Sequence, residues 1–167
     1  RDADLEDTDS FRMIFDTYSD RQNGFVFGTN AAAMEYDGQV TNEGQGGGGL
    51  RGNQQSGSGS GLNLNWDAAW EVRTHVDERG WSAEFAIPFS TLRYPRTDPQ
   101  SWGIRIWRNY PRGFRHGIFS SPYPAGSNCF ICHLHELRGI AGLPSSGHLV
   151  AAPYVSGQDV AQAPEPG

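Results

Sequence analysis

Residues 65–92, NWDAAWEVRTHVDERGWSAEFAIPFSTL, form the stretch that decides the fold. Apolar and polar residues alternate along two short segments, 70–76 and 81–87. Because successive side chains of a β-strand point to opposite faces, this period of two predicts two strands, each with one buried and one wet face. The segment 77–80 has no apolar residue and ends in glycine, which adopts positive φ at no steric cost, so it predicts a turn. A lone hairpin is marginally stable in water, so further strands must cover it.

The flanking sequence repeats the same pattern. Asn23-Gly24 is a strong signal for a tight hairpin turn, whereas residues 109–128 are rich in Gly, Pro and Ser and predict irregular structure. Further strands are predicted at residues 11–17, 25–29, 102–107 and 137–143. Seven or eight short strands without a long amphipathic helix predict an all-β fold, an antiparallel β-sandwich.

The length of 167 residues suits a single domain with a real core. We expect that domain over residues 1–155, interrupted by a flexible glycine-rich insertion at 44–61 and followed by a polar tail at 156–167. The chain begins at an arginine, which suggests a processed protein or a fragment. No run of about 18 apolar residues is present, so no transmembrane helix is expected.

Composition narrows the classes of function. A net charge of −6 argues against a nucleic-acid partner, because phosphate binding needs a basic surface. Glu71 and Glu84 could face each other across the predicted hairpin, but a hydrolase with paired carboxylates also needs a cleft. No nucleophile-elbow serine or zinc-protease helix is found. We therefore expect a protein that is not an enzyme.

Five blocks carry a resemblance to a known family. They are residues 9–17, 20–27, 65–70, 80–89 and 102–105, including DRQNGFVF, NWDAAW and GWSAEFAIPF. In this order they resemble the sandwich domain, similar to carbohydrate-binding module family 9 and to sugar- or haem-binding sandwiches, at the N-terminus of uncharacterised bacterial outer-membrane barrel proteins. The resemblance covers about residues 5–155. It implies export to the periplasm or cell surface of a Gram-negative-type envelope, with 149–155 resembling the lead into a barrel that this chain lacks.

The segment Cys129-Phe-Ile-Cys132-His133 has two main interpretations. A disulfide that pins an irregular loop is preferred. The alternative is attachment of a c-type haem, with thioethers from the two cysteines and His133 as an axial ligand. The opposite axial ligand would come from His116, His148, Met13 or Met34. A zinc site is a third, weaker interpretation, since two more ligands would be needed.

Aromatic residues supply the candidate binding surface. Trp70, Trp81 and Trp102 are in phase with the apolar faces and are expected in the core. Trp66 precedes its strand and Trp107 is out of phase with its apolar neighbours, so these two are the better candidates for exposed rings that bind a glycan or a partner, with simple packing as the alternative. The segment 109–119 interleaves arginine with aromatics, a composition typical of protein interfaces. The alternative is an ordered loop that packs on the edge of the sandwich. Its candidate contact residues are Tyr110, Arg112, Phe114 and Arg115.

The acidic N-terminal segment offers oxygen ligands. Asp7 or Asp9, together with Asp16, is a candidate calcium site, although the spacing does not match a helical calcium loop. Taken together, the sequence predicts a non-catalytic exported domain that docks onto a partner protein or membrane complex, or binds a glycan. The alternative is a c-type haem module for electron transfer.

Overall fold

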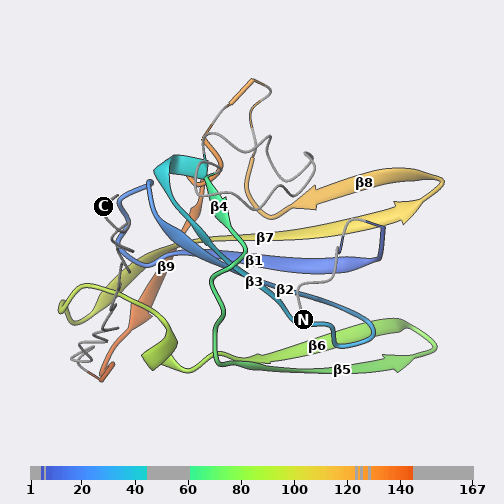
Figure 1. Ribbon diagram of the computed structural model, residues 1–167, viewed down its shortest axis with the longest axis horizontal. Helices are drawn as coiled ribbons and strands as arrows, with labels where there is room; N and C mark the ends of the chain where they lie inside the picture. The colour runs from blue at the N-terminus through green and yellow to red at the C-terminus, as the bar shows by residue number, and fades with distance from the viewer. Residues whose placement is uncertain are drawn as a thin grey trace, which may run out of the picture.

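The computed structural model describes residues 5, 7–44, 61–122, 124, 126–127 and 129–144. Within this part of the chain there are nine strands and two short 3₁₀ turns, drawn in Figure 1. The strands are β1 (Ser10–Asp16), β2 (Gly24–Asn30), β3 (Tyr36–Val40), β4 (Leu62–Asn63), β5 (Glu71–Asp77), β6 (Gly80–Ala86), β7 (Gln100–Arg112), β8 (Phe114–Phe119) and β9 (His135–Ile140), and the turns are η1 (Asn42–Gly44) and η2 (Phe89–Thr91). Most of the predicted glycine-rich insertion (44–61) and the whole polar tail (156–167) lie outside the described residues.

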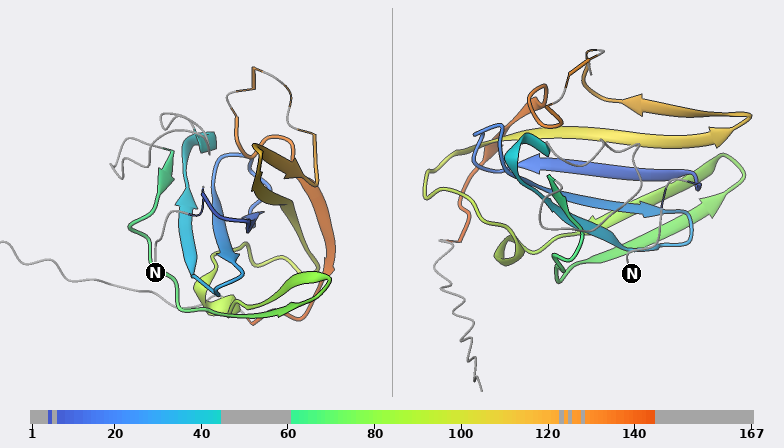
Figure 2. Two further views of the ribbon diagram at one scale, coloured as in Figure 1. Left: turned by 90° about the vertical axis from the view of Figure 1, so that its right-hand side faces the viewer. Right: turned by 45° about the horizontal axis from the view of Figure 1, so that its top comes forward.

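The strands form two antiparallel layers. The larger sheet has the order β4-β3-β2-β1-β7-β8, with β9 also paired to β7, and the smaller sheet is the β5–β6 hairpin. Figure 2 shows this hairpin lying across one face of the larger sheet. The predicted all-β, sandwich-like fold is therefore confirmed, although its second layer is a single hairpin.

The β5–β6 hairpin has the predicted strands and turn. Asp77 pairs with Gly80, whose φ is 144°, and the Asp77 carboxylate accepts the N–H of Arg79. Half-buried residues alternate with exposed ones along β6 and along β5 as far as Thr74, whereas Val76, predicted on the buried face, is 62 % exposed near the turn. The register places Glu84 opposite Arg73, so the expected facing of Glu71 and Glu84 is wrong.

An aromatic core lies between the two layers. Trp70 and Trp102 are buried here, as predicted, and the Trp70 ring stacks on Phe85 with centroids 5.6 Å apart. Trp81 is only half-buried. The buried members of the cluster are Phe25, Phe27, Ala68, Trp70, Leu92, Tyr94 and Trp102. The larger sheet and the segments flanking the β5–β6 hairpin supply these buried residues, and the half-buried Val72 and Phe85 of that hairpin pack against them, so the cluster holds the layers together.

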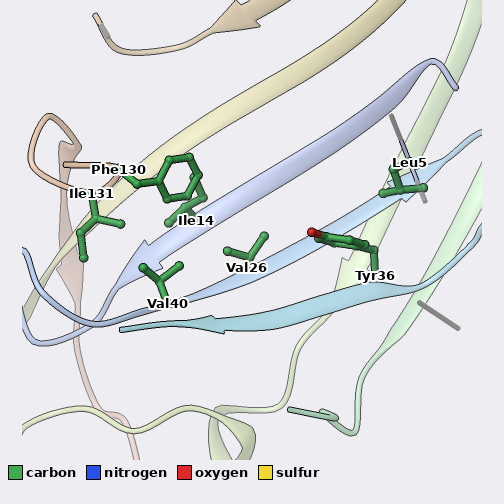
Figure 3. Packing of buried hydrophobic residues seen from close by; sticks show 7 residues of the cluster. All are labelled: Leu5, Ile14, Val26, Tyr36, Val40, Phe130 and Ile131. Atoms are coloured by element: carbon green, nitrogen blue, oxygen red, sulfur yellow. The ribbon is translucent and has the colours of Figure 1, made fainter. Parts of the chain in front are cut away.

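A second core covers the opposite face of the larger sheet. Leu5 and the loop residues Phe130 and Ile131 cover Ile14, Val26, Tyr36 and Val40, as the side chains in Figure 3 show. Strand β1 is therefore buried on both faces, and Arg12 and Asp16 are each only 2 % exposed. The assumption of one wet face for each strand fails at β1 because the chain folds over both sides of the sheet.

The connection between β1 and β2 differs from the predicted tight turn. It spans residues 17–23, and its positive φ angles fall at Ser19 and Arg21 rather than at Asn23 or Gly24. Carboxylates order this loop, since Asp16 accepts the N–H groups of Asp20 and Arg21. A Cβ on Gly24 would lie 2.7 Å from the carbonyl oxygen of Phe15, so glycine is required there by close packing of the backbones.

Residues 109–119 are regular, which corrects the prediction of irregular structure. Strand β7 continues to Arg112, turns at Gly113 with φ of 70°, and returns as β8. Pro111 lacks a backbone N–H and is disfavoured inside a sheet, yet it is tolerated here in the last two residues of β7, next to the turn. This hairpin carries most of the predicted contact residues.

Candidate partner-binding site

The β7–β8 hairpin has two faces with opposite character. Its register pairs Trp107 with Phe119, Arg108 with Ile118 and Arg112 with Phe114. Because alternate residues of a strand point to opposite sides, residues 107 and 119 share one face and residues 108, 112, 114 and 118 share the other. Figures 1 and 2 show this hairpin extending beyond β1 at the same end of the molecule as the β5–β6 hairpin.

The first face of the hairpin is buried. Trp107 is 6 % exposed, and its ring stacks on Phe119 with centroids 5.5 Å apart and an interplanar angle of 15°. The Arg12 guanidinium lies 4.7 Å from the Trp107 ring and 4.8 Å from the Tyr36 ring. The expectation that Trp107 is exposed is therefore wrong. Its phase relative to Ile104 and Ile106 places it beside Arg12, on the face of the larger sheet that carries the second core, and not in water.

The second face of the hairpin is exposed. We define the hairpin face as residues Arg108, Tyr110, Arg112, Phe114, His116 and Ile118. Phe114 is 82 % exposed and Ile118 is 56 % exposed, while Arg112 and His116 are also exposed. Exposed apolar side chains that are flanked by arginine and tyrosine are typical of the residues that dominate the energy of protein interfaces.

Cation–π contacts order the arginines of this face. The guanidinium of Arg108 lies 5.0 Å from the centre of the Tyr110 ring, and that of Arg112 lies 5.2 Å from it on the same strand. Such a contact contributes about 0.5–1 kcal/mol at an exposed site. The exposed guanidinium of Arg112 is thereby held against the Tyr110 ring.

Arg108 is tied to the rest of the sandwich through Asp9. Its Nε and Nη2 donate to the two carboxylate oxygens of Asp9 at 2.9 and 2.8 Å. The pKa of Asp9 is lowered, chiefly by this hydrogen bond from Arg108 and further by one from the Trp81 side chain, against an opposing effect of burial. Since Trp81 belongs to β6, Asp9 links the hairpin to the second layer.

The predicted calcium site does not form. Asp9 precedes β1 and Asp16 ends it, so the two carboxylates are separated by the length of that strand, roughly 20 Å. Asp7 is exposed, Asp9 pairs with Arg108, and Asp16 accepts backbone N–H groups. These acidic residues therefore have structural partners and cannot share one ion.

Trp66 and Arg115 lie apart from the exposed cluster. Trp66 is partly buried in the aromatic core, with its ring centroid 5.1 Å from that of Phe25 and 6.0 Å from that of Phe27. Its main contacts are thus with the core. Arg115 pairs with Pro111 in the hairpin ladder, and its side chain lies outside the described parts of the structure.

Cys129 and Cys132 form a disulfide with their Cα atoms 5.5 Å apart. The two residues between them, Phe130 and Ile131, fill the second core. Joined in this way, the sulfur atoms carry neither the thioethers of a c-type haem nor the thiolates of a zinc site, although the Glu43 carboxylate lies within 4.8 Å of both sulfurs. His133 is exposed. The disulfide interpretation is the one that this geometry supports.

The other candidate haem ligands are dispersed. Met13 lies on β1 and Met34 packs against the second core, whereas His116 lies on the exposed hairpin face. His148 lies outside the described residues. The three candidates in the described part of the chain, Met13, Met34 and His116, therefore lie on separate elements.

A buried arginine holds the disulfide loop in place. Arg105 is 0 % exposed and donates to Ser121 Oγ at 2.7 Å, to the Phe130 carbonyl at 2.8 Å and to the His133 carbonyl at 2.9 Å. Its planar fork satisfies loop carbonyls that would otherwise be buried without donors. This network organises the loop around the disulfide.

A polar pocket of about 240 Å³ lies beside this loop. Its lining includes Asp16, Trp102, Cys132, His135 and Glu136. Glu136 accepts from Ser101 and Arg138, which lower its pKa to about 2, and a ring nitrogen of His135 lies 2.7 Å from the Ser120 carbonyl. The carboxylate of Asp16, whose pKa is raised by burial, accepts backbone N–H groups. These groups are engaged within the chain, so the pocket ranks below the hairpin face as a binding site.

Three members of the hairpin face, Arg108, His116 and Ile118, were not among the contact residues predicted from sequence. The distribution of charged residues along the sequence could have indicated this region. Residues 99–135 contain four of the thirteen arginines and three of the five histidines, but none of the nineteen acidic residues. In a chain with a net charge of −6, this segment is a local basic region.

Among the residues that the structure describes, no helix has both the length and the apolar character needed to cross a membrane. Comparison with protein-family models, with curated proteins and with solved structures found no match for the chain. The function must therefore be argued from the geometry of the site.

Proposed function

We propose that this chain is a non-catalytic, exported binding domain that docks onto a partner protein of the cell envelope through the hairpin face. One observation carries the proposal: Phe114 and Ile118 are 82 % and 56 % exposed on a face that also presents an arginine ordered by Tyr110. Burial of the Phe and Ile side chains would contribute about 3 kcal/mol or more to docking.

A glycan is the competing ligand, in keeping with the resemblance to carbohydrate-binding sandwiches. The geometry favours protein, because the two tryptophans expected to stack on sugars are engaged elsewhere. Trp66 contacts Phe25 and Phe27, and Trp107 is stacked on Phe119. Export is supported by the disulfide, since disulfides persist mainly in oxidising compartments.

The test is a photocrosslinking experiment in intact cells. A photoreactive phenylalanine analogue is incorporated at position 114 and, as a matched control, at position 82, where Ser82 is exposed on the outer face of β6. The proposal predicts a discrete protein adduct from position 114 and none from position 82. Excess purified chain should compete the adduct away, and the Phe114→Ser/Ile118→Ser chain should not. Equal adducts from both positions, or none from either, would count against docking through this face.

Two further measurements separate the competing functions. Binding on a glycan array that survives Phe114→Ser but is lost on Trp66→Ala would favour a sugar-binding function instead. A Soret band with sharp reduced α and β bands in the native purified protein would replace the proposal with the c-type haem alternative. We expect neither signal.

A further inference from the structure

Strand β8 lies at the edge of the larger sheet. The strand order ends at β8, which pairs with β7 along one side. Among the described residues, no other strand pairs with its outer side. An edge strand presents alternate N–H and C=O groups that can extend the ladder, and proteins use such edges to bind extended segments.

The side chains beside this edge have a definite order. Phe114, His116 and Ile118 alternate along β8 on the exposed face, and Arg112 lies across from Phe114 on β7. An added strand would place its own alternate residues next to these three, because cross-strand neighbours lie about 5 Å apart. Apolar residues would fit beside Phe114 and Ile118, and an acidic residue would fit between them, near His116 and Arg112.

The charge of the hairpin selects among possible occupants. A second copy of this chain would bring together two hairpins that each expose Arg112 and hold no acidic residue, whereas Arg108 is already paired with Asp9. Like charges brought together disfavour that pairing. An acidic occupant is complementary to the same segment.

From these observations we infer that the β8 edge receives an extended acidic segment of the partner protein, which adds a strand to the sheet. This inference rests on the proposed function and specifies the partner's chemistry. The segment alternates apolar, acidic and apolar residues on the side facing Phe114, His116 and Ile118. Anionic glycans and lipids share the negative charge, but they lack the backbone groups that extend a ladder.

The test uses a capped nine-residue peptide. Valine and glutamate take turns at its odd positions, which share one side of an extended strand, and threonine occupies its even positions. The readouts are chemical-shift changes and hydrogen exchange of β8 amides in the full chain. We expect exchange of the outward-pointing β8 amides to slow at least tenfold at saturation. The peptide with lysine in place of glutamate should bind at least tenfold more weakly. Added salt should lower the affinity of the acidic peptide.

Two N-methylated peptides supply the matched control. One carries methyl groups on the amides that would face β8, and the other carries them on the alternate amides. Only the first should lose binding. Equal binding of the two isomers, equal binding of the lysine peptide, or slowed β8 exchange with phosphatidylglycerol vesicles but not with the peptide would overturn the inference. If the photocrosslink at position 114 persists while the acidic peptide fails, docking stands and only the acidic-strand inference falls.

Discussion

The substitution Arg105→Met tests the network that holds the disulfide loop. It keeps most of the aliphatic volume of a side chain that is 0 % exposed but removes three hydrogen bonds of 2.7–2.9 Å. The Phe130 and His133 carbonyls and the Ser121 hydroxyl then lose their donor. Each buried group left unsatisfied costs about 1–3 kcal/mol, so a total loss of about 3–5 kcal/mol is expected once partial access of water is allowed.

Urea unfolding followed by tryptophan fluorescence measures this loss. With a slope of about 2 kcal/mol per molar urea, the midpoint should fall by about 2 M. The matched control is Arg112→Met, which alters an exposed arginine on the same strand and should change stability by no more than about 0.5 kcal/mol. If Arg105→Met shifted the midpoint as little as the control, the loop would not depend on the buried guanidinium.

Two further predictions concern stability. Replacing Cys129 and Cys132 together by serine should cost about 2 kcal/mol, the value for a closed loop of about four residues; reductant should then change the urea midpoint of the parent chain but not that of the variant. The folded pKa of Asp9 is lowered below its unfolded value of 3.8, so its pairing with Arg108 stabilises the fold fully above that value and is lost as the pH falls through the folded pKa. Asp9→Asn should remove that part of the acid dependence and cost about 1 kcal/mol of stability at pH 7. This value is modest because the Arg108 side chain is 42 % exposed. An unchanged acid-denaturation curve would refute the role of this pair.

The β5–β6 hairpin could be predicted from sequence because local signals agree along it. Alternation is unbroken from Trp70 to Thr74 and from Trp81 to Phe85, and an acidic turn ends in Gly80. Local preference and tertiary contact therefore favour the same structure. The buried positions of Trp70 and Trp102 follow from the same alternation.

The burial of Trp107 could not be predicted, because the alternation of apolar and polar residues was interpreted on the assumption that each strand has one face in water. Arg12 and Arg105 mark the second face as polar in the sequence, yet both are buried. Arg12 lies against the rings of Tyr36 and Trp107, and Arg105 satisfies loop carbonyls. These contacts join distant segments, which no local pattern encodes.

The regular structure of the β7–β8 hairpin was hidden by its composition. Pro111 and Gly113 are depleted in strands, and both occur where the hairpin turns. Tyr110, Arg112 and Phe114 were nevertheless predicted as contact residues from their interface-like composition, and the structure brings these three together on the exposed hairpin face.

The hairpin face is tested most directly by the double substitution Phe114→Ser/Ile118→Ser, compared with Val76→Ser. Val76 is 62 % exposed on the other hairpin, so both variants remove exposed apolar surface. The free energy of unfolding measured in urea should stay within about 0.5 kcal/mol of the parent value in both. Affinity for the envelope protein crosslinked at position 114 should fall roughly a hundredfold in the double variant and remain unchanged in the control. Equal affinity of parent and double variant for that protein would contradict docking through the hairpin face.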